Sequence, residues 1–141
     1  MIAMNATEVR KEWSAVMDDV VRVRPALIKR TRDRMLLSDV GTILSLLSKY
    51  RFTAARFTED DGSVTLSLNE IDLIENAPTE AEAKHLLAES IMEYANEYYE
   101  QFALWSSAPN RKDHVPFVLK ALLTDDIHIL EESIVCRNGK S

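Results

Sequence analysis

The stretch TEAEAKHLLAESIMEYANEYYEQFALW (residues 79–105) is the clearest helical sequence in this chain. Thr79 and Glu82 form a capping box, in which each side chain can satisfy a free backbone N–H group at the helix start. Apolar side chains then recur at steps of three or four, which is the period of an amphipathic helix. The pattern predicts a helix over residues 79–106 that ends before Pro109. Its apolar stripe comprises Leu87, Ile91, Tyr94, Tyr98, Phe102 and Trp105.

Two alternating segments precede this helix and predict a β-hairpin. Residues 52–58 and 63–68 alternate apolar and polar side chains, and the connection between them ends in the pair Asp61-Gly62. An Asp-Gly pair between alternating segments is a strong hairpin signal. After the long helix we expect one helix capped by Asp113, a short one starting near Thr124, and a frayed tail from Arg137.

The first fifty-one residues predict a separate small α+β module. We expect a short edge strand over residues 1–4 and an amphipathic helix over residues 7–21, capped by Asn5 or Thr7. A hairpin with the basic tip Lys29–Arg34 follows, and then a helix from Asp39 to about Tyr50. The fold class is therefore α+β: a strand-helix-hairpin-helix module over residues 1–51, and a second α+β region with a β-hairpin, a long helix and short C-terminal helices over residues 52–141.

Charge divides the chain at the same place. Residues 1–51 hold ten of the seventeen Lys and Arg residues and six of the 23 Asp and Glu residues, a balance of +4. The remainder has a balance of −10 within a whole-chain net charge of −6. A basic segment favours contact with phosphates and an acidic one favours a cationic partner, although an ordinary solvated surface would look the same.

Composition excludes several classes of protein. Cys136 is the only cysteine, so neither an intrachain disulfide nor a thiolate metal cluster can form. The first ten residues lack the apolar core of a signal peptide, and no apolar run approaches the ~20 residues that span a bilayer. We therefore expect a cytoplasmic protein that does not contact the membrane.

Signs of catalysis are weak. Glu82, His85 and Glu89 could place two metal ligands on one helix face, but a di-metal bundle needs a second Glu-x-x-His segment, which the sequence lacks. His114 and His128 are isolated. The sequence has no Gly-rich phosphate loop and no nucleophile motif. We expect no enzyme activity, no catalytic residues, no metal and no cofactor.

The N-terminal module carries a family resemblance. Residues 7–14 are TEVRKEWS, residues 25–30 are PALIKR and residues 35–38 are MLLS. In order and spacing these segments resemble prevent-host-death (Phd/YefM-type) antitoxins, over roughly residues 1–50. The resemblance implies a homodimer that binds operator DNA through this module, as a transcription repressor, and a C-terminal part that neutralises a toxin. The hairpin turn departs from the family pattern because it contains no glycine.

The same resemblance suggests roles for individual residues. Arg10 and Arg30 match the family's operator contacts, and arginine suits both phosphates and guanine edges. Further charge at the proposed DNA site comes from Lys11, Lys29, Arg32 and Arg34. For the core or the dimer interface we expect Trp13, Val16, Met17 and Val20.

Two interpretations of the long helix remain open. Its apolar stripe can pack on the preceding hairpin, or the helix can bind a basic partner such as a toxin through its acidic face of Glu89, Glu93, Glu97 and Glu100. The leading functional prediction is the antitoxin of a type II toxin–antitoxin system that also represses its own operon. The alternative is a dimeric ligand- or protein-binding module that has a Phd-like fold and no DNA recognition.

Overall fold

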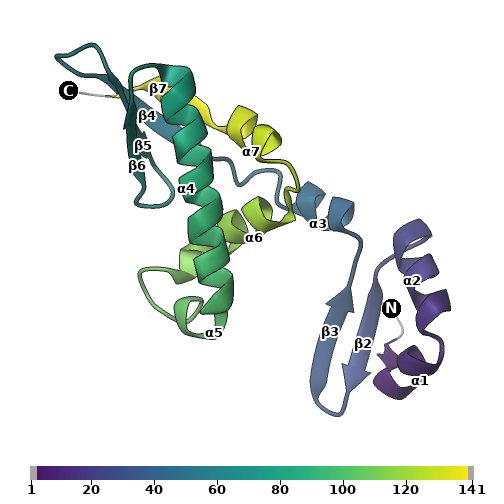
Figure 1. Ribbon diagram of the computed structural model, residues 1–141. Helices are drawn as coiled ribbons and strands as arrows, with labels where there is room; N and C mark the ends of the chain where they lie inside the picture. Colours follow the sequence, from purple (N-terminus) through teal and green to yellow (C-terminus); the bar gives the residue numbers. More distant parts are fainter. Residues whose placement is uncertain (1–2, 140–141) are drawn as a thin grey trace. The chain divides into compact units, whose positions relative to one another are not determined.

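The computed structural model describes residues 3–139, and the chain forms two compact units. Unit 1 is Met1–Leu46 and unit 2 is Leu47–Ser141. Both contain helices and strands, so the α+β prediction is confirmed (Figure 1). Met1 and Ile2 of the predicted edge strand lie outside the described residues.

As far as the structure describes it, from residue 3 onwards, unit 1 contains a three-stranded sheet and three helices. Strand β2 pairs antiparallel with β3 and parallel with β1, which gives the order β1-β2-β3. The side chain of Asn5 caps the first helix by accepting a hydrogen bond from the Thr7 N–H (2.8 Å). The elements are β1 (Met4–Asn5), α1 (Ala6–Lys11), α2 (Trp13–Arg22), β2 (Ala26–Arg30), β3 (Asp33–Leu37) and α3 (Val40–Leu46).

Both predicted helices of unit 1 differ from those observed. The helix expected over residues 7–21 bends at Glu12, whose φ of −107° and ψ of 26° leave the helical region. Its hydrogen-bond ladder continues through the bend, because the Glu12 N–H donates to Glu8 O and the Val16 N–H to Glu12 O. The helix expected as far as Tyr50 ends at Leu46. None of its residues is buried, and a short helix without packing gains little from extension.

The core of unit 1 is small. Only Val9, Val16 and Val20 are buried among its described residues. Of the residues predicted for the core or the dimer interface, Val16 and Val20 are buried, whereas Trp13 and Met17 are 45% and 42% exposed and so lie outside the core. They belong to a set of eight exposed large hydrophobic side chains in this unit, namely Trp13, Met17, Val21, Val23, Met35, Leu36, Val40 and Leu46.

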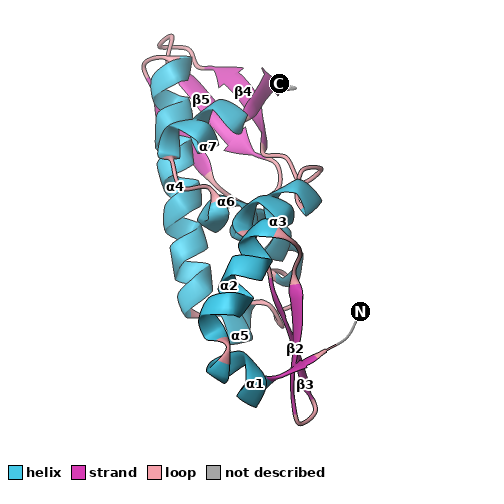
Figure 2. Cartoon of the chain, turned by 90° about the vertical axis from the view of Figure 1, so that its right-hand side faces the viewer, coloured by secondary structure: helices cyan, strands magenta, loops and turns pink. Residues whose placement is uncertain are grey.

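Unit 2 contains a four-stranded sheet among its described residues, and the long helix α4 packs against one side of it (Figures 1 and 2). The strand order is β6-β5-β4-β7, and β7 runs parallel to β4 while the other pairs are antiparallel. Helix α4 contacts β5 and β6 as well as α6 and α7. The elements are β4 (Thr53–Thr58), β5 (Val64–Leu68), β6 (Ile74–Ala77), α4 (Glu80–Glu100), α5 (Phe102–Trp105), η1 (Lys112–His114), α6 (Val115–Leu123), α7 (Ile127–Ser133) and β7 (Val135–Asn138).

The apolar stripe of α4 packs inside unit 2, as the first of the two interpretations predicts. Leu87, Ile91 and Tyr98 are at most 1% exposed. Towards the C-terminal end of the helix, the Trp105 ring stacks on Tyr94 and meets the ring of Tyr98 edge-on. The Arg111 guanidinium lies 3.8 Å from the centre of the Trp105 ring. The Tyr98 hydroxyl donates to the Arg111 carbonyl (2.8 Å), which ties the loop after α5 to α4.

Several local predictions for unit 2 are confirmed. The 52–58 and 63–68 segments pair as β4 and β5. At the start of α4, the Thr79 hydroxyl accepts a hydrogen bond from the Glu82 N–H (3.2 Å). A helix follows Thr124, and the Asp126 side chain caps it by accepting the His128 N–H (2.8 Å).

Four other predictions are wrong or incomplete. The long helix is interrupted at Gln101, where the backbone leaves the helical region. Asp113 does not cap a helix; it lies in a 3-10 turn, and α6 begins at Val115 with a proline in its first turn. In the tail that we expected to be frayed, Arg137 and Asn138 pair with β4 in strand β7, while Lys140 and Ser141 lie outside the described residues. Strand β6 has no counterpart among the predicted elements.

The turn between β4 and β5 depends on Gly62. Its φ of +85° is a conformation that side chains with a Cβ rarely adopt, whereas the space around it is open, with no heavy atom within 4 Å of a Cβ placed there. Gly62→Ala should therefore cost about 1 kcal/mol of unfolding free energy through the backbone alone. Urea unfolding would measure this, with the exposed Asp60→Ala in the same turn as the control. Equal stability of Gly62→Ala and wild type would contradict this account.

Candidate functional site

Arg10 and Arg30, which lie twenty residues apart in the sequence, line one hollow of unit 1. Arg10 projects from the last turn of α1 and Arg30 from the end of β2. The hollow has a volume of about 470 Å³, and polar and apolar side chains contribute about equally to its lining. We call it the arginine hollow; it is lined by Asn5, Ala6, Thr7, Val9, Arg10, Ile28, Arg30, Thr31 and Met35.

The other four predicted DNA-binding residues do not line the hollow, and two of them lie on a different face of the hairpin from Arg30. Lys29 lies directly opposite Arg34 in the β2–β3 ladder, and Arg30 lies opposite Asp33. Because successive side chains of a strand point to opposite faces, the Lys29–Arg34 pair occupies the face away from Arg30. Arg32 is in the exposed turn, and exposed Lys11 ends α1. The structure therefore groups the six cations into at least two sets.

Most of these cations have no acidic partner. Arg30 forms an ion pair with Asp33 (2.9 Å), but within residues 3–139 no ion pair involves Arg10, Lys11, Lys29, Arg32 or Arg34. Like charges directly opposite one another destabilise a sheet. The Lys29–Arg34 pair thus costs unit 1 stability when nothing is bound, and an anion lying across it would remove that cost.

The hairpin turn closes without glycine because Thr31 adopts the left-handed conformation, with φ of 55°. A β-branched residue is unfavourable there. The conformation lets a two-residue turn join β2 to β3, and it places Thr31 at the rim of the arginine hollow.

Helix α2 carries an exposed apolar stripe beside its buried one. Val16 and Val20 face the core, whereas Trp13, Met17 and Val21, each four residues apart, are exposed. We call these three residues the α2 stripe. A mainly apolar groove of about 780 Å³ also opens on unit 1, and its lining includes Leu27, Leu36, Ile43 and Leu46.

The four predicted toxin-binding glutamates form an exposed row along α4. Glu89, Glu93, Glu97 and Glu100 follow one another at steps of four, four and three residues, so they share a helix face. Glu89 bonds to His85, while the other three have no ion pair with any described residue. Like charges at these spacings destabilise a helix slightly, by about 0.2–0.5 kcal/mol per pair.

His85 bridges two helices through two carboxylates. Its Nδ1 lies 2.6 Å from Glu131 Oε1 on α7, and its Nε2 lies 2.6 Å from Glu89 Oε1 on α4. A carboxylate only accepts hydrogen bonds, so both contacts are satisfied only when the imidazole carries both protons. The bond to Glu131, followed by the charges of Glu89 and Glu131, raises the pKa of His85 above its ordinary value.

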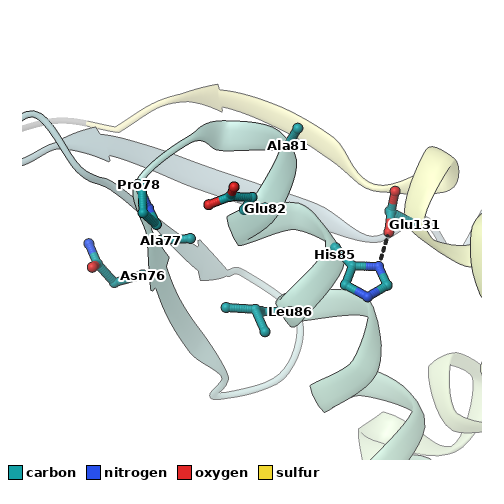
Figure 3. A pocket seen from close by; sticks show the side chains of 8 residues that line it. All are labelled: Asn76, Ala77, Pro78, Ala81, Glu82, His85, Leu86 and Glu131. Atoms are coloured by element: carbon teal, nitrogen blue, oxygen red, sulfur yellow. Dashed lines mark hydrogen bonds and ion pairs between the residues drawn. The ribbon is translucent and has the colours of Figure 1, made fainter.

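A depression of about 500 Å³ adjoins His85 at the start of α4 (Figure 3). The end of β6 and the first turns of α4 supply most of its surface. It is lined by Asn76, Ala77, Pro78, Ala81, Glu82, His85, Leu86 and Glu131. Sequence reasoning missed Glu131 and the β6 residues, because only the tertiary fold brings them beside His85.

The described residues contain no grouping of three or more His, Cys, Asp or Glu side chains suited to hold a metal ion. Among the same residues, no helix is both long enough and apolar enough to cross a membrane. Cys136 is half-buried, and burial raises the pKa of its thiol.

Two comparisons with known proteins find similarity to antitoxins. A family model described as "PHD_like: Antitoxin of toxin-antitoxin, RelE / RelB, TA system" matches residues 1–136, which span both units. A crystal structure of an antitoxin part of a proposed toxin/antitoxin system from Syntrophomonas wolfei subsp. wolfei is similar over 99% of this chain and 100% of that chain, with 35% sequence identity and a TM-score of 0.91. No curated protein matches the chain.

The His85 bridge makes the stability of unit 2 depend on pH. A raised folded-state pKa means that the bridge stabilises fully below the unfolded value of about 6.5 and that this stabilisation is lost as pH rises through the folded value. Unfolding free energy should therefore fall as pH rises above 6.5, and His85→Gln should flatten this fall. Urea unfolding at several pH values would test it, with exposed His128→Gln as the control. The same slope in His85→Gln as in wild type would contradict the assignment.

Proposed function

The chain belongs to the PHD-like family of antitoxins of toxin–antitoxin systems, and we propose that it represses its own operon by binding operator DNA as a homodimer, in the manner of Phd/YefM-type modules. An antitoxin of such a system has a toxin as its partner. The antitoxin prediction is confirmed at that level. Repression, dimerisation, a cytoplasmic location and a binding rather than catalytic role are the proposal.

The main observation in support of DNA binding is that Arg10 and Arg30 line the same hollow. One arginine comes from a helix and one from a hairpin, and both line the same hollow, whose surface is about half polar. Such a site can hold a phosphate or the edge of a base, since arginine binds both through paired donors. The unpaired cations Lys29 and Arg34 on the other hairpin face supply further phosphate contacts.

The α2 stripe supports the dimer. Trp13, Met17 and Val21 present apolar side chains to solvent on a unit that fully buries just three valines among its described residues. A second copy of the same helix, related by two-fold symmetry, would cover the stripe with an identical one. The symmetry would also double each arginine contact and match a two-fold operator.

The acidic row of α4 supports toxin neutralisation. Glu93, Glu97 and Glu100 are exposed and unpaired within the described residues, and they repel one another in the free protein. A cationic partner would relieve that repulsion. Toxins that act on RNA need cations to hold its phosphates, so an acidic antitoxin surface is complementary to them.

Operator binding should depend on Arg10 and Arg30 together. Arg10→Ala/Arg30→Ala removes two cations per chain and four per dimer, so the salt slope of log affinity should decrease by up to about 3–4. Titration of DNA upstream of the gene at several salt concentrations would measure this. The control is Arg22→Ala, which removes an exposed arginine that pairs with Asp18 (3.3 Å) on α2. An unchanged affinity and slope in the double variant would overturn the site.

Dimerisation should depend on the α2 stripe. Trp13→Glu places a charge in the proposed interface and leaves the buried valines unchanged. Sedimentation should therefore show a monomer, and titration with operator DNA should show weaker binding. The matched control is Tyr99→Glu, a similarly exposed aromatic residue on α4 (67% exposed). A dimer of undiminished stability in Trp13→Glu would exclude α2 as the interface.

A further inference from the structure

Strand β6 leaves backbone groups unpaired at the edge of the unit 2 sheet. It is the outermost strand and pairs only with β5 among the described residues. The Leu68 N–H donates to the Leu73 carbonyl at the hairpin end (2.9 Å). Since hydrogen-bonded and non-hydrogen-bonded pairs alternate along an antiparallel ladder, Glu75 and Ala77 bond to β5, while the N–H and C=O groups of Ile74 and Asn76 point away from it.

An apolar depression lies beside this edge. The depression of about 500 Å³ starts at Ala77 and Pro78, where β6 ends, and continues over Ala81 and Leu86 on α4 (Figure 3). Leu86 is 38% exposed, whereas its neighbour Leu87 in the apolar stripe is fully buried. A chain that extended along β6 would thus find a place for an apolar side chain directly next to its backbone hydrogen bonds.

The rim of the depression is acidic. Glu82 has no ion pair with any described residue, and no Lys or Arg lines the depression. His85 is shared between Glu89 and Glu131, so this group keeps a net negative charge even when the imidazole is protonated. The occupant that fits is a segment with at least one Lys or Arg near its apolar side chain.

We propose that the toxin adds an extended, cationic segment to the free edge of β6 and seats an apolar side chain over Leu86. The inference rests on the proposed toxin partner and specifies where and how it docks. A second copy of this chain is the poorer occupant, because pairing β6 with β6 across a two-fold axis would bring two acidic rims together.

The backbone character of the contact gives a sharp test. Ile74→Pro removes one outward N–H and keeps the ladder bonds to β5, and proline is tolerated where a strand edge faces solvent. Ile74→Ala removes the side chain and keeps the N–H, so it is the matched control. Using the toxin from the neighbouring reading frame as the probe, we expect binding about tenfold weaker for Ile74→Pro and at most about threefold weaker for Ile74→Ala.

Amide exchange gives a second, variant-free measurement. In the wild-type chain, the Ile74 and Asn76 amides should exchange at least about tenfold more slowly when the toxin is bound, whereas the free chain should show no concentration-dependent protection. Full-strength binding by folded Ile74→Pro, or unprotected amides in the complex, would overturn the edge while leaving the toxin partner intact. Concentration-dependent protection of these amides in the free chain would indicate that β6 pairs with β6 of a second copy, and it would also overturn the toxin as the occupant of this edge. A wild-type chain that fails to bind the toxin would instead overturn the proposed function and this inference with it.

Discussion

The small core of unit 1 is the constraint on which the functional account depends. Burying a valine or leucine side chain contributes about 1.5–3 kcal/mol, and a unit of fewer than about 70–80 residues rarely gains enough in this way to offset its chain entropy. Unit 1 buries three valines among its described residues and exposes Trp13, Met17 and Val21 on one helix. A dimer through the α2 stripe would therefore complete the fold as well as double the arginine hollow.

Unit 2 meets a different constraint. Among the described residues its core holds seventeen buried residues, six of them on α4, so unit 2 does not need its remaining surfaces to form a core. The acidic row of α4 and the free edge of β6 are such surfaces, and both suit a cationic partner. The charge imbalance of the chain thus acquires a structural meaning: the predicted DNA-binding cations lie on the β2–β3 hairpin and the end of α1, while four glutamates of unit 2 lie on one exposed face of α4.

Local chemistry made much of the fold predictable, and long-range pairing limited it. Thr79, Asp126 and the Asp61-Gly62 pair act within a few residues, so their caps and turn follow from the sequence. Strand β7 forms only because β4 lies beside it, and Glu131 reaches His85 from forty-six residues away. Only the family resemblance predicted that Arg10 and Arg30 belong to one site. The separation of Lys29 from Arg30 follows from strand alternation.

The most direct test of the account is the concentration dependence of unit 1 unfolding. Each unit holds one of the two tryptophans, so Trp105→Phe leaves Trp13 to report on unit 1. A fold that depends on a dimer gains stability with protein concentration. The midpoint temperature of unfolding followed by Trp13 fluorescence should therefore rise across a roughly hundredfold increase in protein concentration. The midpoint of the main helical transition in circular dichroism, which reports chiefly on the long helix of unit 2, should stay constant. A Trp13 transition that stays at one temperature would contradict the dependence of unit 1 on a second copy.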